Sequence, residues 1–446
     1  MKISIITVFP DIYESFLKLS LIGRAIEKKI IDVKLIRFSD MCEPKVRIDN
    51  PACGPGAGMV IKPEVIQKAI QKSEREWGKG FKIFFSPQGE RLEQPLLKKL
   101  AQKFFLKESS QRVETKEDHI ILVCARYEGI DQRVEDFYAD LILSIGDYVV
   151  MGGDLPAQVF LESFLRLVPG VVGKFESVEK ESFSGPFLDY PTYSLPKEWN
   201  GLKVPEILLS GNHAEIEKFR KKQAAKKTVL NRFDWFRSSN PKKEEIELAK
   251  EFIPNHYVAL MHTQVLVQDN KEGNTSITSL DIHDIARSSA TYGIKNYFVV
   301  SQLKDQQNIL KSFMEFWLSD EGKEYNLSRF EAVKRIIPAF NFEDVFNKIK
   351  EKEGVEPIII TTSAKADNSK NIRPKIIDYS CQKEIFKKKR PVLFLFGTGK
   401  GLSYSILEKS DYLLLPVNGM TNYNHLSVRS AVAIILDRWL GLFNKL

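Results

Sequence analysis

Residues 120–156 constrain the fold of this 446-residue chain more than any other stretch. They read as an apolar run, a polar turn (RYEG), a short helix, a second apolar run and a glycine-rich turn (GDYVVMGGD). The turns contain Arg126, Glu128 and Asp147, which are residues that a packed core rarely accommodates. Because loops that follow buried strands are where α/β proteins bind ligands, we expect both turns to line one pocket.

Length and composition limit the class of protein. At roughly 100–200 residues per domain, the chain should form two to four domains. A net charge of +8 favours a polyanionic partner such as nucleic acid. Cys42, Cys53, Cys124 and Cys381 form no zinc pattern and the six histidines are scattered, so we expect a reduced, cytoplasmic protein without a protein-ligated transition metal. No apolar run reaches the roughly 20 residues of a membrane span, and no signal peptide is recognisable.

The first 170 residues alternate between strands and helices, a pattern that predicts a mainly parallel sheet. A loop at 47–59 carries Gly54, Gly56 and Gly58, and we interpret it as a lid, with a simple connector as the alternative. Residues 86–94 should form a turn that leads into a helix, and 155–168 should be helical. The predicted strands are 2–8, 32–38, 81–85, 119–124 and 141–144.

A second α/β pattern begins near Tyr257. Its expected strands include 257–261, 264–267, 296–300 and 412–415, with a helix at 279–292 and a long C-terminal helix. Between the two patterns lie a polar, aromatic linker at 173–196 and a basic helical segment at 197–247. The basic face of that segment is either a solvated surface or a surface that binds RNA phosphates. Its candidate contacts are Lys218, Arg220, Lys221 and Lys222.

The motifs FFSPQGERL, LVCARYEGIDQRV, SIGDYVVMGGDLPA, RLVPGVVG and ILLSGNHAEI occur in order within residues 1–237. On these motifs the first half resembles the bacterial tRNA (guanine-N1)-methyltransferase family, which belongs to the SPOUT class. Residues 255–446 carry SLDIHDIARSSATYG, FGTGKGL, LLLPVNG and YNHLSVRSAVAIILDR, and they resemble a second SPOUT-type family of RNA methyltransferases.

The resemblance implies an α/β fold with two trefoil-knotted SPOUT methyltransferase domains in tandem, at 1–172 and 255–446. The linker 173–196 and a small all-helical domain at 197–247 lie between them. In the family this helical domain grips the anticodon arm of tRNA, and the enzyme is a homodimer that uses S-adenosyl-L-methionine. The implied reaction is methylation of N1 of the guanine immediately 3′ of the anticodon.

Glycines in the loops that follow the strands would let backbone groups approach the cofactor closely. By resemblance to the family, the cofactor contacts are Pro87, Gly89, Ala125, Arg126, Tyr127, Glu128, Gly129, Ile145, Gly146, Asp147, Tyr148, Val149, Val150, Gly152 and Pro156.

Methylation of guanine N1 requires a base for the N1 proton and a cation or donor for O6. The family's arginine falls on Arg166. Its aspartate base falls on Glu181, one methylene longer, with Glu179 as the alternative. The resemblance also makes Asp49 a substrate contact and places Glu128 where a magnesium ion could be supported. A non-catalytic RNA-binding protein is the opposed hypothesis for this half.

The sequence FGTGKGLS in the second half is not a P-loop, because Phe394 and Gly401 occupy positions that require glycine and Ser/Thr. No base is evident there. Arg287 and Arg429 are candidate RNA or catalytic residues, with surface charge as the equal alternative. The second domain therefore either methylates another RNA site or is a non-catalytic module for RNA binding or dimerisation. Its expected cofactor contacts are Gly397, Gly399, Leu415, Pro416 and Ser427.

Overall fold

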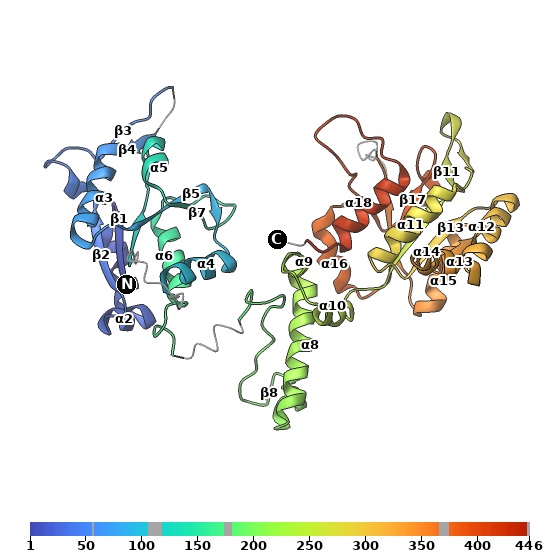
Figure 1. The fold of residues 1–446 in the computed structure, drawn as a ribbon, viewed down its shortest axis with the longest axis horizontal. Helices are drawn as coiled ribbons and strands as arrows, with labels where there is room; N and C mark the ends of the chain where they lie inside the picture. Colours follow the sequence, from blue (N-terminus) through green and yellow to red (C-terminus); the bar gives the residue numbers. More distant parts are fainter. Residues whose placement is uncertain (56–57, 106–117, 174–180, 365–373, 444–446) are drawn as a thin grey trace. The chain divides into compact units, whose positions relative to one another are not determined.

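The computed structural model describes residues 1–55, 58–105, 118–173, 181–364 and 374–443. The chain divides into two compact units, Met1–Ser184 and Gly185–Leu446. Each unit is built on its own parallel β-sheet (Figure 1), and each is described separately below.

The first unit has a five-stranded sheet in the order β2-β1-β6-β5-β7, with all neighbours parallel. This confirms the five strands predicted from the alternation of apolar runs and helices. Their bounds are β1 (Lys2–Thr7), β2 (Asp32–Arg37), β5 (Phe81–Arg91), β6 (His119–Val123) and β7 (Leu141–Ser144).

Both faces of this sheet are buried, which explains the nearly continuous apolar runs of its strands. Ile5 and Leu122 face a core shared with α2, α4 and α6, whereas Ile6 and Val123 face α3 and α5. A turn η1 (Pro10–Tyr13) follows β1. The helices are α1 (Glu14–Lys18), α2 (Ser20–Glu27), α3 (Pro63–Trp77), α4 (Gln94–Phe105), α5 (Gln132–Tyr138) and α6 (Asp154–Leu165).

The prediction of a turn throughout 86–94 is wrong in part. Strand β5 continues to Arg91, because Glu90 and Arg91 resume pairing with Leu143 and Ser144 of β7. Phe85 also pairs with Leu143, so the intervening residues 86–89 leave the ladder as a loop. A hydrophobicity pattern does not reveal this return, since Glu90 and Arg91 are polar and exposed.

The second unit has a seven-stranded sheet in the order β14-β13-β10-β17-β15-β18-β16, again parallel throughout. The predicted strand at 264–267 is only the short β11 (Val265–Leu266), paired with β12 (Glu272–Gly273) outside the main sheet. The sheet strands are β10 (His256–Met261), β13 (Asn296–Val300), β14 (Ile336–Ala339), β15 (Ile358–Thr362), β16 (Lys375–Ile377), β17 (Val392–Gly397) and β18 (Tyr412–Leu414).

The inner strand order β13-β10-β17-β15-β18 repeats the order β2-β1-β6-β5-β7 of the first unit, with β14 and β16 added at the edges. Parallel strands direct their carboxyl ends to one edge of a sheet. The loops after β15, β17 and β18 therefore correspond in topology to those after β5, β6 and β7.

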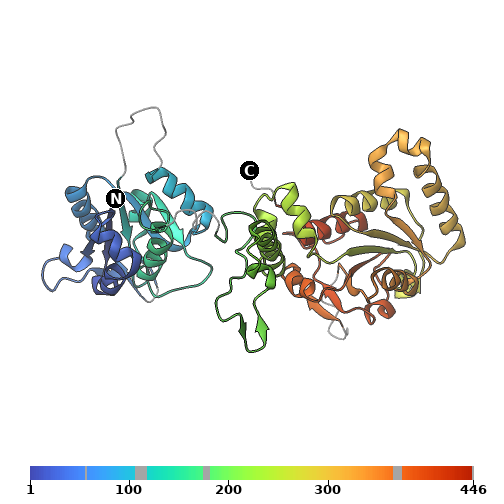
Figure 2. The same ribbon diagram turned by 90° about the horizontal axis from the view of Figure 1, so that it is seen from below.

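Helices cover both faces of the second sheet (Figure 2). On one face lie α11 (Ser279–Thr291), α16 (Gln382–Lys387) and α18 (Val428–Leu440). On the other lie α15 (Phe342–Glu353) and α17 (Tyr404–Leu407). Between β13 and β14 the chain forms α12 (Lys304–Trp317), α13 (Asp320–Tyr325) and α14 (Leu327–Val333).

The basic helical segment packs on the core of the second sheet. The Phe233 ring packs edge-on against the Phe386 ring of α16, with 5.3 Å between the ring centroids. Val229, Phe236 and Ala249 are buried in the same hydrophobic cluster as Trp439. A hairpin of β8 (Glu198–Trp199) and β9 (Leu202–Lys203) and the turn η3 (Glu206–Leu209) lead into it. Its helices are α8 (His213–Asn231), α9 (Phe233–Ser238) and α10 (Lys243–Lys250).

Candidate active site

Three loops of the first unit have close backbone contacts: residues 86–89, which interrupt the pairing of β5 with β7, and the loops that follow β6 and β7. The N–H of Gly153 donates to the carbonyl of Ala125 at 2.7 Å. A Cβ on Gly153 would lie 2.9 Å from Cys124 Cα, and one on Gly89 would lie 2.6 Å from the Ile142 carbonyl carbon. Only glycine fits such contacts between backbones, so the loops pack without side chains between them.

These loops contain nearly all of the predicted cofactor contacts, namely Pro87 and Gly89 in the 86–89 loop within β5, Ala125 to Gly129 after β6, and Ile145 to Val150 with Gly152 after β7. Pro156 lies buried in α6 instead. Positive φ angles at Tyr127 (62°), Gly129 (117°) and Gly146 (146°) give the loops irregular backbone. Such backbone exposes N–H and C=O groups that can read a ligand's edges.

Arg126 has a structural anchor that the sequence did not reveal. Its Nε donates to Asp154 Oδ2 at 2.9 Å, and Asp154 is fully buried at the start of α6. Thr7 and Tyr13 donate to Asp154 Oδ1 at 2.5 and 3.2 Å. Burial raises the pKa of the Tyr13 phenol, which therefore stays protonated. This network joins the ends of β1 and β6 to α6, and only the tertiary fold brings its members together.

Gln88 and Glu135 form a second contact that was not predicted. The Gln88 amide donates to Glu135 Oε2 at 3.0 Å and joins the 86–89 loop within β5 to helix α5. Burial raises the pKa of Glu135, although the hydrogen bond from Gln88 acts in the opposite direction.

The predicted lid contains a short hairpin of β3 (Asp49–Pro51) and β4 (Met59–Ile61). It lies against the loop after β6, because the N–H of Glu128 donates to the Met59 carbonyl at 3.0 Å. Asp49 is buried and accepts two hydrogen bonds from Arg47 at 2.9 and 3.0 Å. Those bonds lower the pKa of the Asp49 carboxyl, so it stays ionised.

Arg166 and Glu181 form an ion pair. Arg166 follows the last residue of α6, whereas the loop after β7 ends at the first. A 12-residue helix is about 18 Å long, so this pair lies far from the three loops within one chain. Glu179, the alternative base, is outside the described residues.

The three loops suit S-adenosylmethionine, since their irregular backbone offers polar groups and Tyr127 and Tyr148 provide exposed rings. Among the described residues, no three His, Cys, Asp or Glu side chains gather as metal ligands would. We refer to these three loops as the glycine cradle.

The second unit also has a glycine loop with close backbone contacts, at the end of β17. A Cβ on Gly397 would lie 2.5 Å from the Leu402 nitrogen, and one on Gly399 would lie 2.8 Å from the Leu266 carbonyl oxygen. Leu266 also accepts from the Lys400 N–H and donates to the Gly401 carbonyl, both at 2.8 Å. The β11–β12 hairpin thus covers the glycine loop.

The loop after β18 carries the remaining predicted contacts of the second unit. Leu415 is exposed and Pro416 is partly buried, while Ser427 caps α18 by accepting from the Ser430 N–H at 3.4 Å. Asn424 donates to the Ala364 carbonyl at 3.0 Å. The loops after β15 and β18 are therefore in contact, as the corresponding loops of a cofactor site would be.

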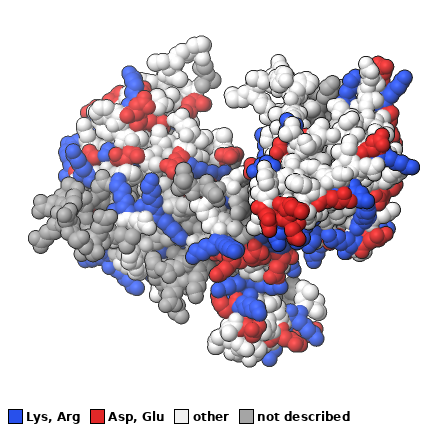
Figure 3. Space-filling view, turned by 45° about the vertical axis from the view of Figure 1, so that its right-hand side comes forward, with Lys and Arg blue, Asp and Glu red and all other residues white. Residues whose placement is uncertain are grey.

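The predicted phosphate contacts on α8 differ in their environments. Lys218 and Lys221 are exposed, Lys222 pairs with Glu251 at 2.6 Å, and Arg220 stacks on Tyr190 at 4.7 Å. Figure 3 shows basic and acidic side chains interspersed on the lower projection that contains α8. Only part of the predicted basic face is therefore free to meet phosphates.

No helix among the described residues is long and apolar enough to cross a membrane.

Residues 1–238 match the family model described as tRNA (Guanine-1)-methyltransferase TrmD, and residues 255–441 match one described as SAM-dependent RNA methyltransferase.

Relatives named tRNA (guanine-N(1)-)-methyltransferase match along the whole chain. The protein from Nitratidesulfovibrio vulgaris is 36% identical over 447 residues, and that from Oleidesulfovibrio alaskensis is 34% identical over the same length, each covering 99% of both chains. A shorter one from Dictyoglomus turgidum is 38% identical and covers 56% of this chain and 96% of its own.

A solved structure, the tRNA (m1G37) methyltransferase from Aquifex aeolicus, is 31% identical, covers 49% of this chain and 87% of its own, and gives a TM-score of 0.40. On the match of the first family model and the full-length relatives, the chain belongs to the tRNA (guanine-N1)-methyltransferase family and carries a second SAM-dependent RNA methyltransferase domain.

Proposed function

We propose that this chain transfers a methyl group from S-adenosylmethionine to N1 of the guanine immediately 3′ of the tRNA anticodon. The observation that carries the proposal is the glycine cradle of three loops at the carboxyl edge of the first sheet, in a chain whose full-length relatives are named for this reaction. The anticodon position rests on the family resemblance of residues 1–237.

In this reaction the cofactor supplies an electrophilic methyl group. Glu181 accepts the N1 proton, and Arg166 stabilises the negative charge that develops on O6. The N1–methyl bond forms as the methyl–sulfur bond breaks. The ion pair between the two residues keeps the Glu181 carboxylate oriented. When guanine binds, either the ion pair opens or the Glu181 carboxylate contacts Arg166 and the guanine N1–H together.

We further propose a homodimer in which each protomer completes the other's site. The estimated 18 Å along α6 separates the loops from the Arg166–Glu181 pair within one chain. Apolar side chains also remain exposed near the loops, at Phe9, Val149, Met151, Leu155 and Val159. Such a patch suits an interface between identical copies.

The proposal includes the trefoil knot at the cofactor loops of each methyltransferase domain. The backbone contacts of Gly153 and Gly89 support it in the first domain, since threaded chain segments must pass at such distances. Residues 1–172 and 255–446 would be the two domains, with 173–196 as the linker. Residues 197–247 would bind the anticodon arm, with Lys218 and Lys221 as phosphate contacts.

Asp49 is proposed to contact the substrate, because the hairpin that carries it lies against the loop after β6. Glu128 is the residue beside which a magnesium ion would bind, since Mg²⁺ in proteins commonly takes one or two carboxylates and several waters. We also propose that the enzyme acts in the cytoplasm, where its tRNA substrate is found.

The test uses unmodified tRNA transcripts, the full chain and mass spectrometry of the nucleosides. The chain should form N1-methylguanosine, and Glu181→Gln and Arg166→Ala should each lower the rate at least about 100-fold while calorimetry shows unchanged cofactor binding. Glu27→Gln, at the exposed last position of α2, is the matched control. Full activity in Glu181→Gln would assign the base to Glu179 instead.

A further inference from the structure

An ion pair joins the first turns of two helices in the second unit. Arg429 Nη1 of α18 lies 3.3 Å from Asp281 Oδ1 of α11, and Arg429 Nε lies 3.6 Å from Asp284 Oδ2. Asp281 is buried, whereas Arg429 is about one-third exposed. The other Asp281 oxygen accepts from the Thr278 hydroxyl at 2.6 Å. A buried carboxylate is thus connected to the surface through one arginine.

Polar side chains with unmade hydrogen bonds surround this carboxylate. Within the described parts of the chain, His262 Nε2 and the Tyr297 hydroxyl have no hydrogen-bond partner, although both side chains are buried. Burial lowers the pKa of His262 to about 4, with the Asp281 carboxylate acting in the opposite direction, so the imidazole is neutral. Leaving such buried groups without a partner destabilises the fold, and a purely structural core avoids it.

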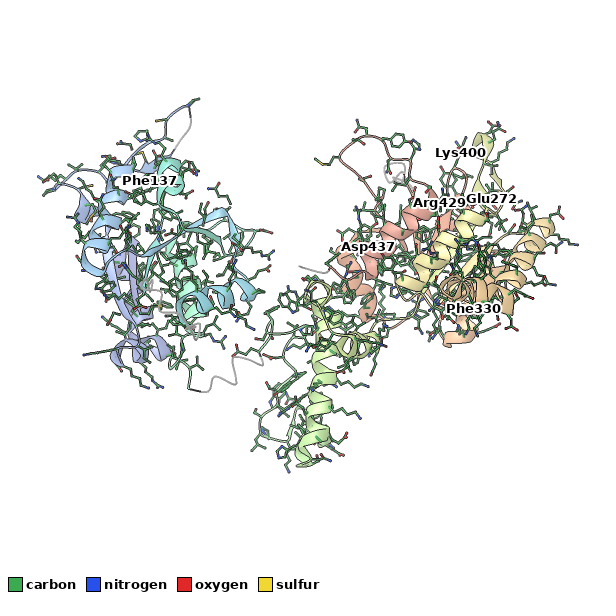
Figure 4. All side chains as sticks on the ribbon, in the orientation of Figure 1. Phe137, Glu272, Phe330, Lys400, Arg429 and Asp437 are labelled. Atoms are coloured by element: carbon green, nitrogen blue, oxygen red, sulfur yellow. The ribbon has the colours of Figure 1, made fainter. Side chains whose placement is uncertain are left out.

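Hydrogen bonds connect this cluster to the glycine loop after β17. His262 Nδ1 lies 3.2 Å from the Thr275 hydroxyl, which lies 2.5 Å from the Thr398 hydroxyl. Thr398 lies between Gly397 and Gly399, two predicted cofactor contacts. Figure 4 shows Arg429 at the same end of the unit as Lys400, whereas Asp437 lies farther along α18.

The two units differ in where the arginine lies on the helix that follows the last loop. Helix α18 follows the loop after β18 as α6 follows the loop after β7, yet Arg429 is in the first turn of its helix and Arg166 is just past the end of its own. In the second unit, an acid and an arginine therefore meet beside the cofactor loops within a single chain.

We propose that Asp281 and Arg429 form the methyl-acceptor site of the second unit and that the acceptor is an imino N–H beside a carbonyl group in RNA, as in guanine N1 or uracil N3. The proposal rests on the second domain using S-adenosylmethionine, as its family model indicates. It is independent of the residues that act in the first unit.

The chemistry of the pair selects this acceptor. Asp281 takes the imino proton, the nitrogen lone pair forms a bond to the donated methyl carbon, and the methyl–sulfur bond breaks to leave a neutral thioether. The proton passes from Asp281 to solvent. Arg429 donates to the adjacent carbonyl oxygen as charge develops there. A carboxylate is too weak a base for a ribose hydroxyl, which lacks the activating carbonyl.

The experiment uses the full chain carrying Glu181→Gln, which silences the first unit. Unmodified transcripts of bacterial tRNAs and ribosomal RNAs are incubated with tritiated S-adenosylmethionine, and the methylated nucleosides are identified by mass spectrometry. We expect N1-methylguanosine or N3-methyluridine. Asp281→Asn should lower its rate at least about 100-fold and Arg429→Lys at least about 10-fold, with two cofactor sites per chain retained.

Asp305→Asn is the matched control, because Asp305 also lies in the first turn of a helix and is exposed. It should retain the full rate. Retained cofactor stoichiometry in Asp281→Asn and Arg429→Lys separates a chemical defect from misfolding. A ribose-methylated or carbon-methylated product, full activity in Asp281→Asn, or no methylated nucleoside in any transcript would overturn the proposal. N1-methylguanosine that the unsubstituted chain forms immediately 3′ of the anticodon, and that Glu181→Gln loses at that position, would show that the first unit's function stands regardless.

Discussion

His256, the first residue of β10, has a hydrogen-bonding pattern that determines its protonation state. Its Nδ1 lies 2.6 Å from the Pro254 carbonyl, which only accepts, and its Nε2 lies 3.0 Å from the Trp439 indole N–H, which only donates. The imidazole must therefore be neutral with the proton on Nδ1. A second proton on Nε2 would oppose the indole N–H, and burial lowers the pKa of His256 to about 4.

This histidine predicts how the stability of the second unit depends on pH. Between pH 6.5 and 4 the unfolded chain binds a proton at His256 that the folded chain excludes, so acidification favours unfolding. The expected loss is about 1.4 kcal/mol per pH unit, or about 3 kcal/mol over this range. The full stabilising contribution of neutral His256 to the free energy of unfolding is present above pH 6.5. Urea unfolding, monitored by tryptophan fluorescence, measures the free energy of unfolding of the second unit at each pH, since only Trp77 of the five tryptophans lies outside that unit.

His256→Gln provides the comparison, because the amide can accept from Trp439 and donate to Pro254 but does not titrate. Its stability should depend less steeply on pH than that of the unsubstituted chain by about 1.4 kcal/mol per unit. His213→Gln, at an exposed position of α8, should leave the slope unchanged. Equal slopes in His256→Gln and the unsubstituted chain would show that His256 is not the titrating group.

At the scale of elements, Arg237 joins the end of α9 to the end of α18. Its guanidinium donates to the carbonyls of Asp437, Arg438 and Gly441, at 2.7 Å for the first two. The last carbonyls of a helix have no partner within it and carry partial negative charge, so a buried arginine there satisfies several groups together. Burial lowers the pKa of Arg237 to about 10, at which it remains charged at neutral pH.

Arg237→Met is expected to destabilise the second unit by about 3 kcal/mol or more. The methionine can fill part of the volume, but the Arg438 and Gly441 carbonyls lose the guanidinium donors at roughly 1–3 kcal/mol each, while the Asp437 carbonyl keeps the Gly441 N–H at 2.8 Å. Thermal unfolding and hydrogen exchange at residues 437–441 should both report the loss. Arg232→Met, which removes an exposed pair with Asp234, should change stability by less than about 1 kcal/mol. A similar small effect in Arg237→Met would refute the structural role.

The sequence predicted the elements better than their connections. Apolar runs located β1, β6, β7 and β13, because strands in the middle of a covered sheet are largely apolar, whereas the edge strand β2 was found from a shorter, mixed pattern. The return of β5 after residue 89 depends on pairing with β7, which no local pattern encodes. For the same reason the Asp154 network was missed, since Thr7 and Tyr13 are distant in sequence.

On the scale of the whole molecule, one strand order occurs twice in a chain without a residue-level repeat. The two copies differ in where they place an acid beside an arginine, at the far end of α6 in one and at the start of α18 in the other. The basic helical segment shares its core with the second sheet, so a tRNA bound along α8 would also be held on the second unit. The proposed tRNA contact of α8 therefore predicts that the second domain acts on the same class of RNA.

The distance along α6 predicts that the first active site is shared between protomers, and mixing two inactive variants tests this. Glu181→Gln keeps the loops intact, while Gly146→Val strains a position with φ of 146° and crowds the Tyr148 ring, which should remove cofactor binding to that unit. If the loops and Glu181 of one site come from different protomers, each mixed dimer has one intact site. Random exchange at equal concentrations should then restore about a quarter of the activity. No recovery, with subunit exchange verified by native mass spectrometry, would place the whole site within one protomer.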